Sequence, residues 1–414
     1  MYAARVRAAA ELVHLYEAVV AELSAERLVA RACAADPPPG GRVVALGLGK
    51  VAVEMLAGAR SALGARLAEG LVVAPVDAPA PRFGVALRGA HPIPDVSSIA
   101  AGEALLAAAR RLGPEDSALL LISGGGSALA EAPAAGIAVD DLRALNRELL
   151  GCGAPVEEVN AVRAHLSRLK GGGLARALLA GGVRRARALV LVDVPSGAPA
   201  AVASGPAAID ISTYIDAVRI AARRHLRLTA AVRGLLEEGA RGQIPETLKP
   251  GEPAADLVAH VALCDLSAPA LVAERLAAGL RPRREPGVVR GPVEEVAKRY
   301  AASEAALLVA SGEPDVVVPR GAPPGGRCQH LALLVARAIR GRPCAFLAAG
   351  TDGRDGETGA AGAVVDGATW DRAPDPERAL ATGAAAPCLA AAGATLPARH
   401  TGAHAGDLHL FLRG

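Results

Sequence analysis

The chain has 414 residues, which is long enough for two or three domains with separate hydrophobic cores. Hydrophobic residues make up 52% of it, which excludes a disordered protein, although aromatic residues are only 2%. Lys and Arg (45) nearly balance Asp and Glu (42) and are spread along the chain. Because no basic stripe forms and aromatic side chains for base stacking are few, we expect no nucleic-acid partner.

The sequence predicts neither a signal peptide nor a membrane span. Residues 1–20 carry apolar side chains at helical spacing, interrupted by charges, which predicts an amphipathic helix. The longest charge-free segment, 379–398, is alanine-rich and broken by Pro387 and Pro397, so we expect it not to span a bilayer. Six cysteines lie far apart without a Cys-x-x-Cys pair, which favours reduced thiols in a cytoplasmic protein.

Short strands and helices alternate through the first 240 residues. A second helix ends near Ala35, before a run of prolines and glycines. Alternation of this kind predicts a mostly parallel sheet with helices on both faces. The predicted strands are 42–46, 70–74, 85–89, 118–122 and 188–192, and the further helices are 51–60, 98–112 and 219–240.

A segment rich in Gly, Pro and Glu, 241–254, is the predicted linker between a domain of residues 1–240 and one of residues 255–414. The second domain shows its own α/β pattern. Its predicted strands are 257–263, 306–310, 316–318 and 345–349, and its predicted helices are 268–278, 293–302 and 329–339. The sequence contains no repeat of 20–50 residues.

The strand 118–122 ends abruptly in the run Ser123-Gly124-Gly125-Gly126-Ser127. Glycines have no Cβ atom, so their N–H groups can approach a ligand closely. If Ser127 opens a helix, the helix start adds unpaired donors and a positive dipole end. The combination suits a carboxylate or a phosphate, and a flexible strand-to-helix turn is the alternative interpretation.

The run GLGKVA at 47–52 follows the first predicted strand. It fails as a Walker A loop, because it lacks the first glycine and a Ser or Thr after the lysine. It nearly passes as a dinucleotide fingerprint, but Glu69 precedes the second predicted strand and Asp77 lies well beyond it. A third interpretation concerns Lys50 alone, whose ammonium group can bind a phosphate at a strand-to-helix turn. An exposed surface lysine is the alternative.

Four cationic side chains, Arg163, His165, Arg168 and Lys170, run into three glycines at 171–173. Helical spacing would place Arg163 and Lys170 on one face, which suits a polyanion. A basic, solvated helix end is the alternative.

Three features of the second domain carry chemistry. Arg327 follows two glycines at the start of a predicted helix, and the loop 350–356 offers the carboxylates Asp352 and Asp355, which suit Mg²⁺ together with substrate phosphate oxygens. Near the C-terminus are donors that transition metals accept, although separate histidines on a polar tail are the alternative: His400, His404, Asp407 and His409. Neither Gly-x-Ser-x-Gly nor His-Glu-x-x-His occurs, so a serine hydrolase or a zincin has no support.

In order and spacing, these blocks resemble the class II glycerate 2-kinases, whose C-terminal half is called the MOFRL domain. The matching blocks are GLGKVA at 47–52, HPIPD at 91–95, SGGGSAL at 123–129, N-x-VR-x-HLS-x-x-KGG at 160–172, ASGP at 203–206, SGE at 311–313, GGR-x-Q at 325–329 and GTDG-x-DG at 350–356. The resemblance covers nearly the whole chain. It implies an α/β fold of two domains, a Rossmann-like three-layer parallel sheet and a smaller mixed-sheet domain, with the active-site cleft between them.

The resemblance implies transfer of the ATP γ-phosphoryl group, with Mg²⁺, to the 2-hydroxyl of D-glycerate or a similar small hydroxy acid, giving 2-phosphoglycerate. Lys50 and Arg327 match the proposed catalytic cations, in keeping with the need of phosphoryl transfer for positive charge. Substrate or nucleotide binding is implied for Gly47, Gly49, Ser123, Gly124, Gly125, Gly126, Ser127, Asn160, Arg163, His165, Lys170 and Glu313, and metal binding for Asp193, Asp352 and Asp355. We expect a small-molecule partner and no membrane, and a homodimer is an open expectation.

The chain also departs from the family pattern, mostly where carboxylates are expected. Gly197 and Ala198 replace two aspartates, His330 replaces a glutamate and Gly359 replaces an aspartate, whereas the cationic residues are retained. Because Mg²⁺ has few protein ligands, a divergent homologue with weak or no kinase activity, acting in binding or regulation, is the second hypothesis. A hydroxypyruvate reductase, resting on the 47–52 turn, is the third.

Overall fold

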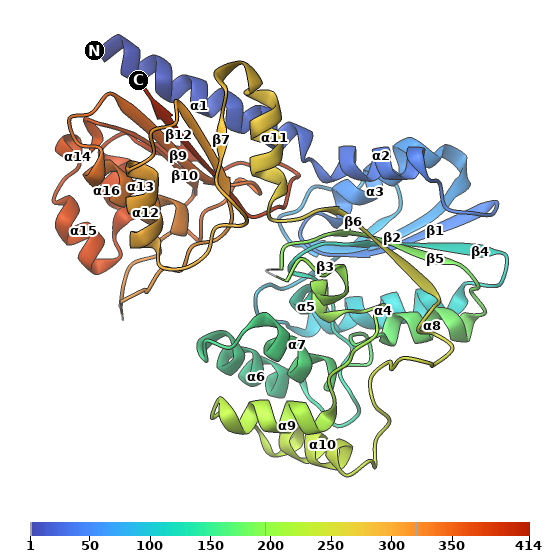
Figure 1. Ribbon diagram of the computed structural model, residues 1–414. Helices are drawn as coiled ribbons and strands as arrows, with labels where there is room; N and C mark the ends of the chain where they lie inside the picture. The colour runs from blue at the N-terminus through green and yellow to red at the C-terminus, as the bar shows by residue number, and fades with distance from the viewer. Residues whose placement is uncertain (1, 195, 320) are drawn as a thin grey trace. The chain divides into compact units, whose positions relative to one another are not determined.

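The computed structural model describes residues 2–194, 196–319 and 321–414, so that Pro195, in the loop after Asp193, lies outside the described residues. The chain forms two compact units (Figure 1). The N-terminal unit comprises residues 25–263, and the C-terminal unit comprises residues 1–24 together with 264–414.

This division corrects the predicted boundaries at residues 240 and 255. The first helix belongs to the C-terminal unit, where Tyr16 is fully buried and donates its hydroxyl to the Gly350 carbonyl at 2.8 Å. The strand predicted for 257–263 is the sixth strand of the N-terminal sheet. The segment 241–254 is therefore part of the N-terminal unit and not a linker.

A six-stranded sheet in the order β3-β2-β1-β4-β5-β6 forms the centre of the N-terminal unit. The pairs β1–β2, β1–β4, β2–β3 and β4–β5 are parallel, which confirms the predicted Rossmann-like sheet. The chain order reverses between β1 and β4, and open sheets bind ligands beyond the carboxyl ends of such strands. The elements are α2 (Ala25–Ala35), β1 (Arg42–Leu48), α3 (Ala52–Leu63), η1 (Gly64–Arg66), β2 (Leu67–Pro75), β3 (Val85–Gly89), α4 (Val96–Arg111), β4 (Asp116–Ile122), α5 (Gly126–Leu129), α6 (Val139–Gly151), α7 (Val156–Ala164), α8 (Gly173–Gly181), β5 (Ala186–Leu191), η2 (Pro199–Ser204), α9 (Tyr214–Arg223), α10 (Ala230–Ala240) and β6 (Val258–Cys264).

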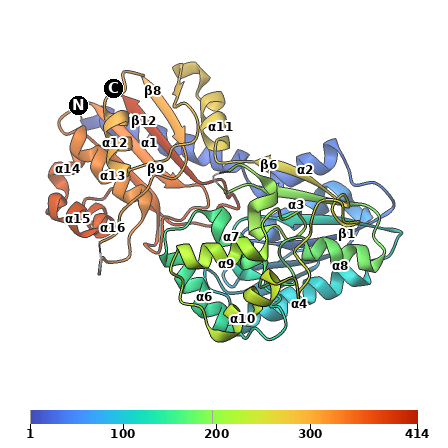
Figure 2. The same ribbon diagram turned by 60° about the horizontal axis from the view of Figure 1, so that its bottom comes forward.

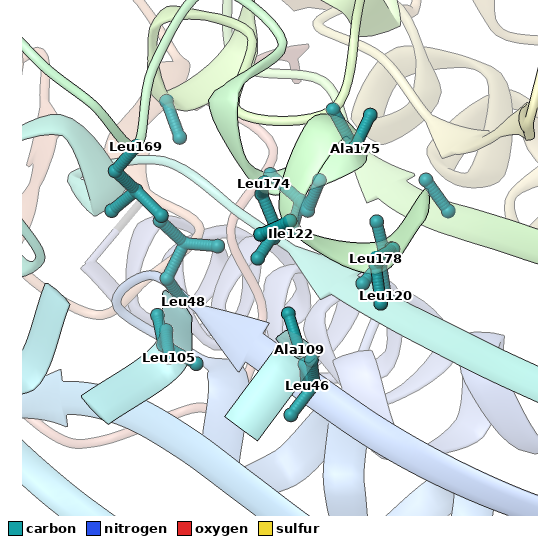
Figure 3. Close-up of a cluster of buried hydrophobic side chains, with 14 of the residues drawn as sticks. Leu46, Leu48, Leu105, Ala109, Leu120, Ile122, Leu169, Leu174, Ala175 and Leu178 are labelled. Atoms are coloured by element: carbon teal, nitrogen blue, oxygen red, sulfur yellow. The ribbon is translucent and has the colours of Figure 1, made fainter. Parts of the chain in front are cut away.

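Helices cover both faces of this sheet, which makes three layers. Leu46 of β1 and Leu120 of β4 pack against Leu105 of α4 and Leu178 of α8 (Figure 3). Helices α2 and α3 lie on the opposite face (Figure 1). Because both faces are covered, the sequences of β1 and β4 are nearly continuous apolar runs. Burial of each of these leucines contributes roughly 2 kcal/mol to the stability of the fold.

Four helices, α6, α7, α9 and α10, enclose a second, smaller core of the N-terminal unit and stand together in both views (Figures 1 and 2). Leu145, Val162, Ile220 and Leu236 meet in it. The prediction of one helix over 219–240 is wrong. Two helices form, because Thr229 caps α10 by accepting a hydrogen bond from the N–H group of Val232.

The C-terminal unit contains a mixed sheet in the order β11-β10-β9-β12-β8-β7. Only the pair β7–β8 is parallel, and the other described pairs are antiparallel, which confirms the predicted mixed α/β domain. Helices α1 and α11 pack on β9 and β8, and α13 packs on β9 and β10 together with α12 and α16. The elements are α1 (Tyr2–Glu22), α11 (Ala268–Leu276), η3 (Ala278–Leu280), β7 (Arg283–Arg284), α12 (Val293–Ala301), β8 (Leu307–Ser311), α13 (Arg327–Ala338), β9 (Cys344–Gly350), β10 (Ala360–Asp366), α14 (Thr369–Arg372), α15 (Pro376–Thr382), α16 (Ala385–Ala391), β11 (Thr395–Pro397) and β12 (Asp407–Arg413).

Two predictions for this unit are wrong. Residues 316–318 form no strand, and Val317 is 90% exposed there, so this apolar run gains little of the burial that favours a strand. The histidine-containing end of the chain is not a polar tail but the inner strand β12, which pairs with both β8 and β9. Among the described residues, no helix is both long and apolar enough to cross a membrane.

Candidate active site

Two loops meet beyond the carboxyl ends of β1 and β4. The N–H group of Lys50 donates to the Gly124 carbonyl at 2.9 Å, and the N–H group of Ser123 donates to the Leu48 carbonyl at 3.1 Å. Gly49 permits this approach, because a Cβ atom there would lie 2.1 Å from Ser123 Oγ. Gly47 is buried within β1. The loops of residues 47–50 and 123–127 are therefore locked against each other.

The two loops differ in how their N–H groups are used. In the first loop, the N–H group of Gly49 donates to the Val73 carbonyl at 3.1 Å, so it is turned into the protein. In the second, we find no acceptor, among the described residues, for the N–H groups of Gly124, Gly125 and Gly126. Gly125 adopts a left-handed conformation with φ 79°, which turns the chain into the single-turn helix α5. The helix opens one residue earlier than predicted, and the unpaired N–H groups suit an anion.

Two cationic or titratable side chains stand beside this glycine loop. A Cβ atom on Gly125 would lie 3.1 Å from Lys50 Cγ and 3.1 Å from His91 Cδ2. Lys50 is half-buried and His91 is exposed. The structure thus brings together Lys50 and the glycine loop, which the sequence analysis considers separately as groups that could bind an anion. His91 was missed as a site residue, and the HPIPD block at 91–95 was the signal that could have found it.

Asn160 supports the glycine loop through a chain of hydroxyl groups. Its Oδ1 accepts a hydrogen bond from Ser204 Oγ at 2.7 Å, and Ser204 Oγ lies 2.8 Å from Ser127 Oγ. Asn160 Nδ2 donates to the Ala201 carbonyl at 2.9 Å. The predicted residues Asn160 and Ser127 are therefore linked through Ser204, whose role sequence reasoning missed.

Lys170 is not a solvent-facing partner of Arg163. Helix α7 ends at Ala164, so the two residues do not share a helix face as predicted. Lys170 is 2% exposed and forms an ion pair with the equally buried carboxylate of Glu131, and burial lowers the pKa of Lys170 despite that attraction. Burial likewise lowers the pKa of Arg163, whose charge is also attracted by Glu131. Glu131, absent from the predicted site, neutralises cations that the sequence assigned to a substrate.

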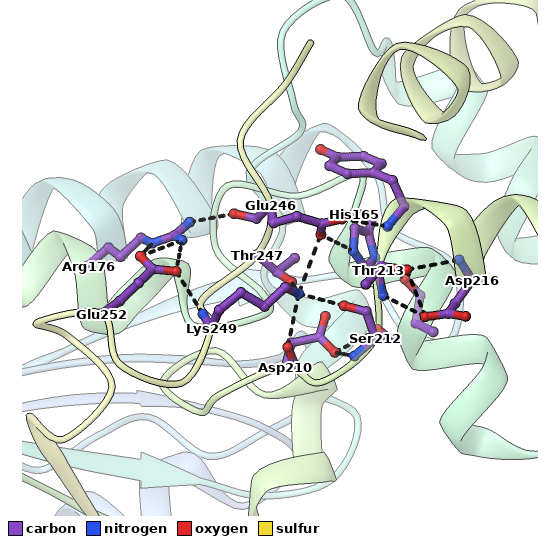
Figure 4. A network of polar contacts seen from close by, with 12 residues as sticks. His165, Arg176, Asp210, Ser212, Thr213, Asp216, Glu246, Thr247, Lys249 and Glu252 are labelled. Carbon is purple, nitrogen blue, oxygen red and sulfur yellow. Dashed lines mark hydrogen bonds and ion pairs between the residues drawn. The ribbon is translucent and has the colours of Figure 1, made fainter. Parts of the chain in front are cut away.

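His165 belongs to a different network, shown in Figure 4. Its Nε2 lies 3.0 Å from Glu246 Oε2, its Nδ1 lies 2.7 Å from the Ala161 carbonyl, and its ring contacts the Tyr214 ring edge-on. His165 also lines a cavity of about 490 Å³ whose walls do not include Lys50 or the glycine loop. The structure therefore does not bring His165 together with Lys50.

Arg327 is the first residue of α13 in the C-terminal unit, at the sheet edge where β8 and β9 end and β12 begins. Its Nε donates to Asp407 Oδ2 at 2.7 Å, and its Nη2 pairs with Glu313 Oε1 at 3.1 Å. Burial alone would lower the pKa of Arg327, but Asp407 and Glu313 outweigh it and raise that pKa above its ordinary value. A third of the side chain, 33%, is exposed. The predicted residues Arg327 and Glu313 are thus neighbours, held by Asp407.

The three carboxylates predicted for a metal have different surroundings. Both oxygens of Asp355 accept backbone hydrogen bonds at the start of α13, from Cys328 at 2.9 Å and Gln329 at 2.8 Å, and burial raises the pKa of Asp355 to about 6. Asp352 accepts from the Arg354 N–H group at 3.0 Å and is only partly buried. Asp193 lies two residues beyond β5 in the N-terminal unit and is partly buried. Asp355 therefore caps a helix, whereas Asp352 and Asp193 are less buried than Asp355.

Two family models match the chain. Residues 6–237 match a domain described as a domain of unknown function (DUF4147), and residues 306–407 match the MOFRL family. A relative from Agrobacterium vitis, provisionally named a hydroxypyruvate reductase, is 36% identical over 79% of this chain and 76% of its own length. A D-glycerate 2-kinase from Thermotoga maritima is 34% identical over 90% of each chain.

A solved structure extends the similarity to the fold. The crystal structure of a glycerate kinase from Thermotoga maritima superposes with a TM-score of 0.84 at 29% identity, covering 97% of this chain and 98% of that one. A protein from Pyrococcus horikoshii matches with a TM-score of 0.78 at 28% identity over 97% of each chain. The chain therefore belongs to the class II glycerate 2-kinase family, whose members carry the MOFRL domain.

Proposed function

We propose that the protein is a kinase that transfers the γ-phosphoryl group of ATP to the 2-hydroxyl of D-glycerate, or of a similar small hydroxy acid, giving ADP and 2-phosphoglycerate. The observation that carries the proposal is the position of the Lys50 side chain over Gly125, beside N–H groups that have no acceptor among the described residues. The family relatives named as glycerate kinases support the choice of substrate.

Phosphoryl transfer asks the protein for positioning and positive charge, because the transition state carries its charge on the phosphoryl oxygens. Lys50 and the N–H groups of Gly124 to Gly126 supply donors for one anionic group, either the phosphoryl group or the carboxylate of the acceptor. Arg327, in the C-terminal unit, is a separate cation that can bind a phosphate group. Its bonds to Asp407 and Glu313 fix the guanidinium in one orientation, and its exposed third remains available for a phosphate oxygen.

The carboxylates fit a magnesium ion that is held mainly by the nucleotide. Mg²⁺ in kinases takes one or two protein carboxylates plus phosphate oxygens and water, and it neutralises the phosphate charge when bound. Asp352 is a partly buried carboxylate in the C-terminal unit, whereas both oxygens of Asp355 accept backbone hydrogen bonds. We assign ATP·Mg²⁺ to Asp352, and we expect the chain to be active despite the replacements at 197 and 198.

The kinetic test uses a matched pair of lysine variants. Lys50→Ala removes the cation beside the glycine loop, and we expect its kcat/KM for D-glycerate to fall by about 10²- to 10³-fold, as when one preorganised donor is lost. Lys298→Ala removes an exposed lysine that pairs with Glu295, and we expect its kcat/KM to be unchanged. Equal kcat/KM in the Lys50→Ala variant and the wild type would refute the role of Lys50.

One set of observations favours a second candidate, a hydroxypyruvate reductase. The strand order of the N-terminal sheet is that of dinucleotide-binding folds, and Asp77 lies two residues beyond β2 rather than well beyond it. Against it, the N–H group of Gly49 donates to Val73 and is not available to a pyrophosphate. NADH oxidation with hydroxypyruvate, measured on the same preparation, separates the two candidates. Nucleotide binding without any turnover would favour the regulatory homologue.

A further inference from the structure

Among the described residues, one cluster of side chains that could bind a metal is separate from the carboxylates considered above for Mg²⁺. Cys328, in the first turn of α13, and Asp407 and His409, in β12, place their donor atoms within 4.8 Å of one another. All three are buried, with Cys328 0%, Asp407 5% and His409 1% exposed. A thiol, a carboxylate and an imidazole are the donor types that Zn²⁺ accepts in proteins, whereas Mg²⁺ prefers oxygen alone.

His409 supplies an independent observation that points to a ligand. Its Nδ1 lies 2.9 Å from the Tyr300 hydroxyl, while its Nε2 is buried and has no hydrogen-bond partner among the described residues. An unpartnered buried polar atom costs about 1–3 kcal/mol. When Nδ1–H donates to Tyr300, the lone pair of Nε2 is left for a metal, as in metal sites where a second group fixes the histidine tautomer.

We propose that Cys328, Asp407 and His409 form a binding site for a transition metal ion of the Zn²⁺ class. The metal bonds to Cys328 Sγ, to one Asp407 oxygen and to His409 Nε2, and the thiol proton is released to solvent. Thiolate and carboxylate together neutralise the divalent ion. Arg327, which bonds Asp407 Oδ2, keeps Glu313 as a second partner for its own charge.

Because the bound metal replaces the thiol proton of Cys328, the affinity for the metal is expected to rise with pH. The site differs from the predicted group of C-terminal donors, because His400 is exposed and His404 faces Asp352 at 3.9 Å.

Cobalt spectroscopy on the full chain tests the site. Protein freed of metal by a chelator is titrated with Co²⁺, and we expect a thiolate-to-cobalt charge-transfer band that saturates at one equivalent. Added Zn²⁺ should abolish the band, and excess Mg²⁺ should leave it unchanged. Zn²⁺ should also raise the melting temperature of the metal-free protein, because a ligand that binds only the folded state stabilises it.

Matched variants identify the ligands. We expect Cys328→Ser to lose the band and His409→Gln to bind Co²⁺ at least tenfold more weakly, while Cys388→Ser, at another buried cysteine, and His400→Gln bind as the wild type does. A band that persists in Cys328→Ser would overturn the proposal. If that variant fails to fold, the wild type still decides, since no charge-transfer band at saturating Co²⁺ would also overturn it.

Discussion

Replacing one member of the buried Lys170–Glu131 pair is expected to destabilise the N-terminal unit strongly, and the two single variants should differ. Both side chains are at most 3% exposed, so neither charge is solvated by water once its partner is lost. Removing one partner of such a pair costs about 3–5 kcal/mol. The prediction separates a structural lysine from the substrate-binding lysine that the sequence suggested.

Glu131→Gln should destabilise the protein more than Lys170→Met. In Lys170→Met, the charge of Glu131 still attracts Arg163, so we expect the free energy of unfolding to fall by about 3 kcal/mol. In Glu131→Gln, both cations lose their carboxylate, and we expect a loss near 5 kcal/mol. Neutralising a lysine of ordinary pKa at pH 7 also costs about 5 kcal/mol, which sets the upper end of the expected decrease in the free energy of unfolding. The double variant, which lacks both charges of the pair, should lose less than the sum by at least about 2 kcal/mol.

Urea unfolding followed by far-UV circular dichroism measures these free energies of unfolding. Lys298→Met is the control, because its exposed pair with Glu295 should contribute under about 0.5 kcal/mol. Losses under about 1 kcal/mol in both single variants, or a double variant whose loss equals their sum, would refute the reasoning.

Three further outcomes are expected. Gly125→Ala should lower both stability, by about 1 kcal/mol, and kcat/KM, because alanine is strained at φ 79° and its Cβ crowds the loop's neighbours; wild-type kcat/KM would contradict this. Asp407→Asn should lower kcat/KM by about tenfold or more, because Arg327 loses the carboxylate that orients its guanidinium group. Arg327→Lys should also lower kcat/KM, because lysine does not reproduce the geometry of the guanidinium group. Unchanged kcat/KM in both variants would count against a role for the Arg327–Asp407 pair. The pKa of His409 is near 4 when folded and about 6.5 when unfolded, so the unfolded state binds the proton first as pH falls. Between pH 6.5 and 4 the wild type should therefore lose about 3 kcal/mol more stability than His409→Gln, and parallel pH profiles in urea unfolding would contradict this.

Much of the N-terminal sheet could be predicted from the sequence, because its parallel strands are buried on both faces and read as short apolar runs ended by glycine. The loop at Ser123 to Ser127 and the turn at Lys50 follow such strands, so their meeting was predictable from the rule that parallel strands end at one edge. Strand β12 was not predictable in this way. Its sequence contains a histidine and has charged residues at both ends, a pattern that is not typical of an inner strand. His409 is buried because β12 pairs with both β8 and β9, which local sequence does not indicate.

The partners of the site residues could not be predicted from local sequence. Lys170 is paired with Glu131, 39 positions earlier, and Arg327 is paired with Asp407, 80 positions later, so the fold alone determines whether each cation faces a carboxylate or a ligand. Asp355 was expected to hold metal because it lies in a glycine-rich loop. It caps α13 instead, since the helix start leaves two N–H groups that need acceptors.

The most direct test of the kinase assignment is phosphorus NMR of the wild-type reaction with ATP, Mg²⁺ and D-glycerate, with NADH and hydroxypyruvate in a parallel sample. We expect the resonance of 2-phosphoglycerate to grow in step with that of ADP, to be lost with Lys50→Ala and to be kept with Lys298→Ala. ATP left intact with D-glycerate and other small hydroxy acids, in a folded sample, would contradict it.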